Sequence, residues 1–195
     1  MYTVIGGQQS RTFRVLWMLE ELGQPYTHQP AKPRTEDVTK HSYLGKIPVL
    51  LEGDAAVTDS TAILTYLADK HGQFTFPAGT LERAKQDGFT FAILDDIDAI
   101  LWTAARHSFI LPEEKRVPEV KESLMWEYTR NIDRIVAQIK GPYLMGEEMT
   151  VPDIILAHCG GWAYNAKFPS DNVDFKAYLK HIRSRSAFQK LTAAA

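Results

Sequence analysis

The sequence predicts an α+β protein of two domains, in which a domain of strands and helices is followed by a domain made only of helices. Three observations predict this fold class. Strand and helix patterns alternate through residue 76, a Pro-Ala-Gly-Thr segment follows at 77–80, and only helical patterns appear after it. We therefore expect a first domain over residues 1–76, a linker over 77–83 and an all-helical domain over 84–195.

The first domain begins with a strand, a helix and a second strand. The first strand covers residues 2–5 and is followed by two glycines. Apolar residues at helical spacing then predict a helix through residue 22 that starts at Ser10 or a neighbour. Residues 25–29 predict the second strand, and the proline-rich and charged stretch 30–42 predicts irregular structure.

The same domain ends with two strands joined by a tight turn and a final helix. Residues 49–52 and 55–58 are short strand patterns on either side of Gly53-Asp54. Asp59 or Ser60 supplies an N-cap for a helix through residue 70, and a glycine lies beyond its end. The resulting order β-α-β-β-β-α is that of a thioredoxin-like domain.

The second domain is predicted from four helical stretches and a short helix near the end. The stretches cover residues 82–109, 119–139, 151–166 and 174–185. Thr150 begins a capping box, in which the Asp153 carboxylate returns to the Thr150 N–H. The helix after it is apolar nearly all round, so we expect it to be buried, with Cys159 as a structural thiol.

Composition excludes several classes of function. A formal net charge of −2 gives no support for binding to nucleic acid or to an anionic membrane. No apolar run approaches the roughly 18 residues of a membrane helix, and no signal peptide is visible, so we expect a cytoplasmic protein. Cys159 is the only cysteine, which excludes internal disulfides, cysteine-rich zinc sites and thioredoxin or glutaredoxin redox chemistry. We expect no metal site.

Residues 46–60 contain two features beyond an ordinary hairpin. Pro48 directly precedes a strand, and a cis Ile47–Pro48 bond would turn the Ile47 backbone groups outward. Asp59 and Ser60 open a helix, so a carboxylate, a hydroxyl and free N–H groups meet at one place. That place fits the amino and carboxylate groups of a small zwitterionic ligand. An edge strand beginning with proline, followed by an ordinary capped helix, explains the same residues.

The segment Lys46-Ile47-Pro48-Val49-Leu50, the Asp59-Ser60 pair and the apolar helix after them resemble the glutathione-binding segment of cytosolic glutathione S-transferases. The resemblance covers essentially the whole chain and is to serine-type members of the kind found in bacteria. It implies a cis Pro48 and pairing of the Ile47 backbone with the cysteinyl part of glutathione. It also implies that Asp59 and Ser60 hold the γ-glutamyl end, and that Lys46 reaches the glycine carboxylate.

A glutathione transferase must form the thiolate of its bound glutathione, because the thiolate is the nucleophile. A hydroxyl aimed at the sulfur, with a helix N-terminus behind it, favours that anion. Ser10 is the best-placed donor, since family members place serine or tyrosine between the first strand and the first helix. The residues around Ser10 depart from the family pattern, so Thr12, Gln9 or a backbone N–H such as that of Arg11 stays open as the partner of the sulfur. A plain helix N-cap also explains Ser10.

The resemblance places the electrophile pocket against the long helix of the second domain. Four residues stand at positions that could face it: Trp102, Thr103, Arg106 and His107. Arg106 and His107 would select an anionic or polar co-substrate, although a solvated helix face also explains them. Three acidic residues cluster on the same helix, Asp95, Asp96 and Asp98, and in some family dimers such a residue reaches the γ-glutamyl site of the partner. A homodimer is implied by the resemblance.

Two kinds of function fit these residues. The first is an enzyme that conjugates glutathione to a small hydrophobic electrophile in detoxification, with peroxidase, isomerase and dehalogenase variants sharing the same site. The second is a glutathione-binding ligand carrier or interaction protein of the same fold with little transferase turnover. A shifted pKa of the bound thiol distinguishes the two.

Overall fold

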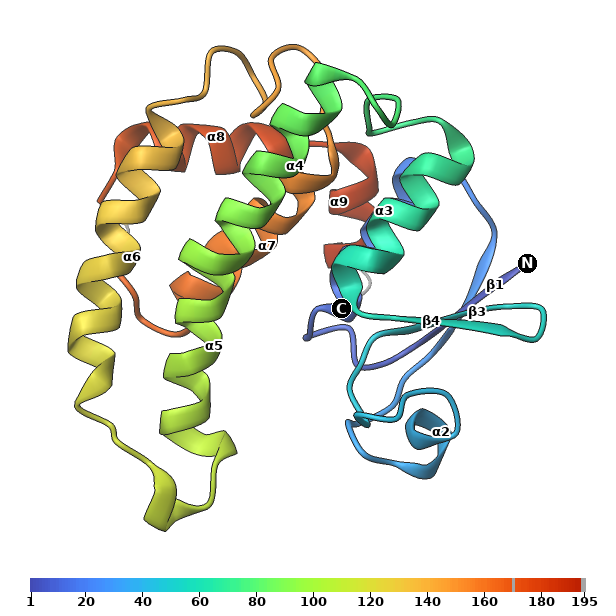
Figure 1. Cartoon of the computed structure of the whole chain (residues 1–195), viewed down its shortest axis with the longest axis horizontal. Helices are drawn as coiled ribbons and strands as arrows, with labels where there is room; N and C mark the ends of the chain where they lie inside the picture. The colour runs from blue at the N-terminus through green and yellow to red at the C-terminus, as the bar shows by residue number, and fades with distance from the viewer. Residues whose placement is uncertain (170, 194–195) are drawn as a thin grey trace. The chain divides into compact units, whose positions relative to one another are not determined.

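The computed structural model describes residues 1–169 and 171–193, and these divide into two compact units. The first unit comprises residues 1–80 together with the described residues from Ser184 onward. The second comprises the described residues from Leu81 to Arg183. Figure 1 shows the strands and α3 in the first unit and the long helices α4, α5 and α6 in the second.

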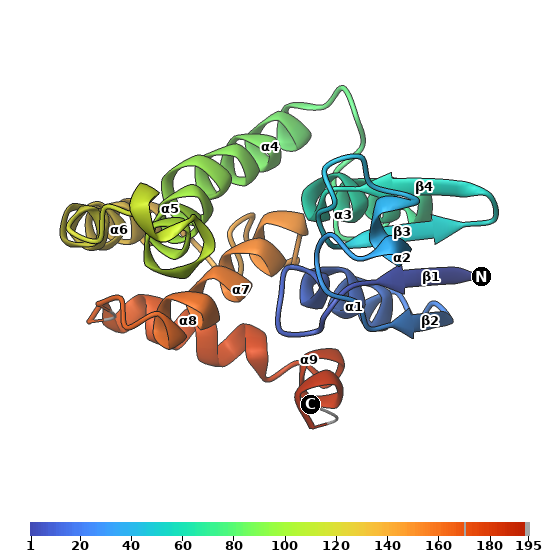
Figure 2. The ribbon, with the colours of Figure 1, turned by 90° about the horizontal axis from the view of Figure 1, so that it is seen from below.

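A four-stranded sheet forms the base of the first unit. Its strands are β1 (Tyr2–Ile5), β2 (Tyr26–Gln29), β3 (Val49–Glu52) and β4 (Ala55–Thr58). They lie in the order β2-β1-β3-β4, where β1 pairs with β2 in parallel and the other two pairs are antiparallel. Tyr2 lies opposite Tyr26 on one side and Glu52 on the other, and Figure 2 shows the strands side by side.

The helices of the first unit are α1 (Thr12–Glu21), α2 (Glu36–Thr39), α3 (Ser60–His71) and α9 (Ser186–Ala193). Helices α1 and α3 contact each other, and both bury apolar side chains such as Leu16 and Ile63 completely or nearly so. The predicted thioredoxin-like order β-α-β-β-β-α is confirmed, with α2 added. The stretch 30–42 was expected to be irregular, but Val38 of α2 is buried in a cluster with Ile5 and Val49.

Helix α9 differs from the expected division of the chain, which assigned all residues from 84 to 195 to one helical domain. The ring of Phe188 lies 5.4 Å from that of Phe13 and 4.9 Å from that of Trp17, both in α1. These contacts bury apolar surface against the first unit, and nothing in the local pattern of α9 could indicate which unit it would join.

The second unit consists of helices. They are α4 (Leu81–Ile93), the π-helical η1 (Leu94–Asp98), α5 (Ala99–Ala105), the π-helical η2 (Arg106–Ile110), the 3-10 turn η3 (Glu113–Lys115), α6 (Val120–Val136), α7 (Val151–Asn165) and α8 (Val173–Arg183). The run from α4 to η2 corresponds to the single long helix expected over 82–109. The apolar spacing of this run does not predict its π-helical segments. Helix α4 begins at Leu81, within the expected linker over residues 77–83.

Helix α7 is the buried helix that the capping box predicted. Asp153 Oδ2 accepts the Thr150 N–H over 2.8 Å, and Met149 and Ile154 are both buried. Burial raises the pKa of Asp153, and hydrogen bonds from Leu144, Thr150 and Tyr178 oppose that rise. Cys159 is a buried free thiol, as expected. Within residues 1–169 and 171–193, no helix is long and apolar enough to cross a membrane.

Candidate functional site

Ser10 lies in the turn that leads from β1 into α1. Its hydroxyl donates to the Gly7 carbonyl oxygen over 2.7 Å, and its backbone N–H donates to the same oxygen over 3.0 Å. The hydroxyl oxygen accepts the Thr12 N–H over 3.1 Å and lies 2.9 Å from Thr12 Oγ1. The Ser10 hydroxyl therefore stands at the N-terminus of α1, where the helix dipole favours a negative charge.

Thr12 is fully buried and lies against the backbone of Gly6. A Cβ atom at residue 6 would stand 2.2 Å from Thr12 Oγ1 and 3.0 Å from Ile47 Cβ, and the φ of Gly6 is +144°. The Gly6 carbonyl oxygen accepts a hydrogen bond from His28 Nε2 over 2.8 Å. The missing side chain at residue 6 thus allows Thr12 and Ile47 to approach the same point of the backbone.

Ile47 lies at the end of the loop that leads into β3. The Ile47–Pro48 peptide bond is cis, as the resemblance implies, and the Ile47 side chain packs on the cluster of Ile5, Val38 and Val49. Among the described residues, neither the N–H nor the C=O of Ile47 has a hydrogen-bond partner. The side chain is thus anchored in the core while both backbone groups remain free to bind a ligand.

Lys46 is exposed, and its backbone N–H donates to Ser42 Oγ over 3.2 Å. The described residues offer its ammonium group no hydrogen bond or ion pair. Its cationic end is therefore available to an anionic group of a ligand.

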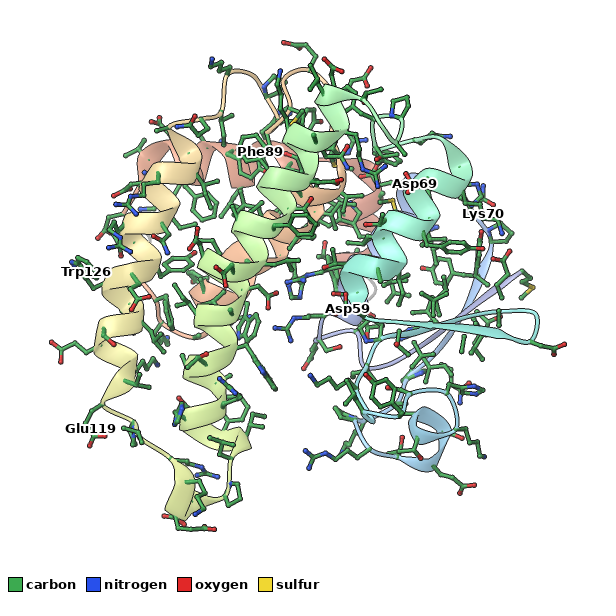
Figure 3. All side chains as sticks on the ribbon, viewed as in Figure 1. Asp59, Asp69, Lys70, Phe89, Glu119 and Trp126 are labelled. Atoms are coloured by element: carbon green, nitrogen blue, oxygen red, sulfur yellow. The ribbon has the colours of Figure 1, made fainter. Side chains whose placement is uncertain are left out.

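Asp59 is the N-cap of α3 and has an unusual backbone conformation, with φ +72° and ψ +125°. Its Oδ1 atom accepts the N–H groups of Thr61 over 2.8 Å and of Ala62 over 3.1 Å. An L-residue in such a conformation costs about 1–3 kcal/mol and is common at binding sites. Asp59 is exposed at the start of α3 (Figure 3), and within the described part of the chain its Oδ2 atom has no partner.

Ser60 is the first residue of α3 and is 3% exposed. Its Oγ atom accepts a hydrogen bond from Nη1 of Arg14 over 3.4 Å, and Arg14 is fully buried in α1. A guanidinium group has donors only, so the Ser60 oxygen acts as acceptor and its proton is available to another group. The Ser60 N–H has no partner among the described residues, because Asp59 caps the two N–H groups that follow it.

Helix α1 links the parts of this site. Its first turn carries Thr12, which lies beside Ser10, Gly6 and Ile47. The same turn carries Arg14, which contacts Ser60 at the start of α3. The site therefore combines two helix N-termini, the unpaired backbone N–H and C=O of Ile47, one exposed carboxylate and one exposed ammonium group. Such a set can bind a peptide that carries carboxylate and ammonium groups and can stabilise an anion beside Ser10.

Comparison with known proteins identifies the family. The N-terminal domain of glutathione S-transferases matches residues 10–70. A glutathione S-transferase from Triticum aestivum is 25% identical over 190 residues, which cover 94% of this chain and 86% of that protein. The crystal structure of a glutathione S-transferase from Pseudomonas fluorescens is 27% identical, covers 95% of this chain and 96% of that one, and has a TM-score of 0.81.

The chain is thus similar to glutathione S-transferases over almost its whole length, and residues 10–70 match the N-terminal domain of that family. A second similar structure, a glutathione transferase homolog from Sulfitobacter with bound glutathione, is 18% identical and has a TM-score of 0.86 over 100% of this chain and 98% of that one. At that identity the likeness concerns the fold alone. The resemblance drawn from residues 46–60 is thus confirmed at the level of the family.

The residues expected in the electrophile pocket lie in the second unit. Arg106 Nη2 donates to Thr103 Oγ1 over 3.2 Å. His107 Nδ1 accepts the backbone N–H of Val117 over 3.1 Å, and Trp102 is half-buried in α5. Thr103 and Arg106 are therefore together on one turn, whereas His107 contacts the loop after η3.

The three acidic residues of the same helical run do not form one cluster. Asp95 and Asp96 are exposed, whereas Asp98 is 6% exposed and lies 3.7 Å from the Cys159 sulfur. All three lie in the π-helical segment η1, whose wider turn departs from the α-helical spacing assumed for the sequence. In the described part of the chain, no group of three or more His, Cys, Asp or Glu side chains could hold a metal ion.

The sequence did not single out three residues that complete the site. Arg14, His28 and Gln8 contact Ser60, Gly6 and the Leu191 carbonyl oxygen, respectively. Arg14 carried one available signal, since it is the charged residue within the otherwise apolar stretch from Phe13 to Leu19. His28 and Gln8 form contacts that depend on the folded chain and carried no local signal.

Proposed function

We propose that this chain is a glutathione transferase that binds glutathione in its first unit, stabilises the thiolate and conjugates it to a small hydrophobic electrophile. The observation that carries the proposal is the set of unused hydrogen-bonding groups at Ile47, Asp59 and Ser60. A single ligand with complementary donors and acceptors could satisfy all of these groups at once.

The start of α3 suits the γ-glutamyl end of glutathione. That end carries an ammonium and a carboxylate group on one carbon atom. The Ser60 N–H and hydroxyl would donate to the carboxylate, and the exposed Oδ2 of Asp59 would accept from the ammonium group. The strained backbone of Asp59 supports this assignment, because it keeps the carboxylate beside the unused N–H of Ser60.

The Ile47 backbone suits the cysteinyl residue of glutathione. An extended peptide can pair with one N–H and one C=O, as an added strand does at a sheet edge. Lys46 stands next to Ile47 with an unpaired ammonium group, so we propose that it binds the glycine carboxylate. Pro48 fixes the backbone between Ile47 and β3. The proposed glutathione-binding set is therefore Lys46, Ile47, Pro48, Asp59 and Ser60.

Ser10 is the proposed donor to the sulfur, with Thr12 as the second choice. Ser10 Oγ lies at the N-terminus of α1 and is half-buried. The thiol would release its proton to solvent, and the thiolate would accept the Ser10 hydroxyl hydrogen bond. The sulfur lone pair then forms a bond to the electrophilic carbon, and the leaving group departs with the electron pair of its own bond. Thr12 is less suited, because it is fully buried.

The wider features of the family belong to the same proposal. Arg106 and Thr103 would favour a polar part of the electrophile, with Trp102 supplying apolar surface and His107 nearby on the same helical run. We also propose a cytoplasmic homodimer acting in detoxification. These assignments rest on the resemblance to the family and on the half-buried positions of Trp102, Thr103, Arg106 and His107.

One observation favours a second candidate, a glutathione-binding carrier with little turnover. The Ser10 hydroxyl donates to the Gly7 carbonyl oxygen over 2.7 Å, so its proton is already used within the turn. Stabilising a thiolate requires the hydroxyl to rotate away from that oxygen. If it does not rotate, glutathione binds as the neutral thiol.

The experiment is a calorimetric titration with glutathione, followed by an assay with a chromogenic electrophile. The wild type and the Ser10→Ala and Ser60→Ala variants are compared. We expect Ser60→Ala to weaken glutathione binding, and Ser10→Ala to retain binding but lose most of the turnover. Binding without turnover in the wild type supports the carrier. An absence of binding at millimolar glutathione contradicts both functions.

A further inference from the structure

Helix α9 is fixed on α1 by two carboxylates and an aromatic cluster. Arg185 donates to both oxygens of Glu21, from Nε to Oε1 and from Nη2 to Oε2, over 2.7 Å each. Lys190 Nζ donates to Glu20 Oε2 over 2.6 Å. The Phe188 ring lies against Phe13 and Trp17 of α1, and Figure 2 shows α9 alongside the first unit.

The carboxylates of Glu20 and Glu21 also accept hydrogen bonds from residues of β2 and α1, respectively. Trp17 Nε1 donates to Glu21 Oε1 over 2.9 Å, and the Tyr26 hydroxyl donates to Glu20 Oε1 over 2.9 Å. The Glu21 side chain is only 6% exposed. A bidentate pair between arginine and a carboxylate, with further donors to the same group, fixes both direction and distance. Helix α9 therefore has one defined position on the first unit.

This position brings α9 to the turn that contains Ser10. Gln8 Nε2 donates to the Leu191 carbonyl oxygen over 3.0 Å, across 183 residues of chain. Leu191 lies in the last turn of α9, where helix carbonyls lack an intrahelical partner. Gln8 follows Gly7, whose carbonyl oxygen accepts both the N–H and the hydroxyl of Ser10.

We propose that α9 positions the Ser10 hydroxyl, through the hydrogen bond between Gln8 and the Leu191 carbonyl oxygen. This inference rests on the proposed function, and Gln8 is a positioning residue that does not touch the sulfur. The turn from Gly7 to Ser10 lies between β1 and α1 and is closed by the two hydrogen bonds from Ser10 to the Gly7 carbonyl oxygen. The Gln8 amide provides an anchor in the middle of the turn and determines where the Ser10 Oγ atom lies.

A positioning effect matters here because a hydrogen bond to sulfur depends steeply on distance and direction. A shift of the turn by a fraction of an ångström would weaken the donor to the thiolate, while the groups at Ile47, Asp59 and Ser60 would stay in place. The predicted signature is therefore a raised pKa of the bound thiol with little change in glutathione affinity.

The test is a titration of the thiolate absorbance of the glutathione complex against pH, in the wild type, Gln8→Leu and Gln73→Leu. Leucine has nearly the volume of glutamine but cannot donate to the Leu191 carbonyl oxygen. Gln73 lies in the same unit with an exposed side chain and is the matched control. We expect Gln8→Leu to lower the thiolate fraction at neutral pH about three- to tenfold, with an affinity for glutathione within about twofold of the wild type, and Gln73→Leu to match the wild type.

A second variant weakens the attachment of α9 to α1 and leaves Gln8 unchanged. Arg185→Met removes the bidentate bond to Glu21 while Gln8 is intact, so it should raise the thiol pKa in the same direction. If both variants fold and both titrate as the wild type does, the inference is wrong. A wild type that forms no thiolate refutes the proposed function, whereas thiolate in the wild type with an unchanged Gln8→Leu titration refutes only the role of α9.

Discussion

Arg14 donates a hydrogen bond to Ser60 across 46 residues of chain, from Nη1 to Oγ over 3.4 Å. Arg14 is fully buried and Ser60 is 3% exposed. The contact joins the helix that carries the Ser10 end of the site to the helix that carries the Asp59 end. A buried positive charge behind the first residue of α3 also favours an anion at that helix terminus.

Replacing Arg14 should therefore weaken glutathione binding, although Arg14 acts on the ligand only through Ser60. We expect Arg14→Met to lower the affinity about three- to tenfold, because Ser60 loses the donor that fixes its hydroxyl. Calorimetric titration with glutathione measures the change. In a double-mutant cycle, Arg14→Met and Ser60→Ala should be coupled, and strictly additive effects would show that Arg14 acts elsewhere.

Gly6 is predicted to tolerate no side chain. Its φ is +144°, and a Cβ atom there would stand 2.2 Å from Thr12 Oγ1. Gly53 also has a positive φ, +57°, but a Cβ atom at that residue would meet nothing within 4 Å, so Gly53→Ala tests the backbone conformation alone. We expect Gly53→Ala to cost about 1–2 kcal/mol of unfolding free energy, and Gly6→Ala to cost more and to weaken glutathione binding.

Urea unfolding followed by fluorescence measures both glycine variants. If Gly6→Ala and Gly53→Ala lower the unfolding free energy by the same amount, the close approach of Thr12 to Gly6 has no energetic consequence.

Glu52 should give the first unit a pH-dependent contribution to stability. Lys70 and Tyr66 both donate to its carboxylate, and the hydrogen bond from Lys70 is the largest cause of its lowered pKa. The pKa of Glu52 is lower in the folded state, so its contribution to stability is fully present above the ordinary glutamate pKa of about 4.3. That contribution is lost as the pH falls through the folded-state pKa.

Melting temperatures of the wild type and Glu52→Gln, measured from about pH 6 to about pH 3, test this. The advantage of the wild type should be constant at the upper end of the range and should shrink as the pH falls. An advantage that stays constant down to the lower end would contradict the role of the Glu52 carboxylate.

The capping box of α7 should be a separate source of stability in the second unit. Thr150 and Asp153 are both buried, and their side chains share a hydrogen bond of 2.9 Å. We expect Thr150→Ala to lower the unfolding free energy by about 0.5–2 kcal/mol, and Thr150→Ser to lose less because it retains the hydroxyl. Denaturant unfolding measures both, and equal losses would assign the effect to the methyl group.

The strands and α3 could be predicted because their signals are local. The strands β1, β3 and β4 begin and end where the apolar runs and turn residues indicate. Asp59 and Gly72 mark the two ends of α3, the latter with a left-handed conformation at φ +62°. The candidate residues Lys46, Ile47, Asp59 and Ser60 lie in this part of the chain, so a short segment indicated most of the candidate site.

The remaining features depend on contacts that the sequence does not reveal. Arg14 is charged and would ordinarily be expected at the surface, but it is fully buried and donates to Ser60, 46 residues further along the chain. The position of α9 depends on aromatic and ionic contacts with α1, far away in the chain.

The measurement that tests the central claim most directly is the pH titration of the ultraviolet thiolate absorbance of the wild-type glutathione complex, with Ser10→Ala beside it. The account predicts a midpoint below the value of about 8.5 for a free thiol, and a return toward that value in Ser10→Ala. A wild-type complex that titrates like free glutathione would contradict the claim that the first unit stabilises the thiolate.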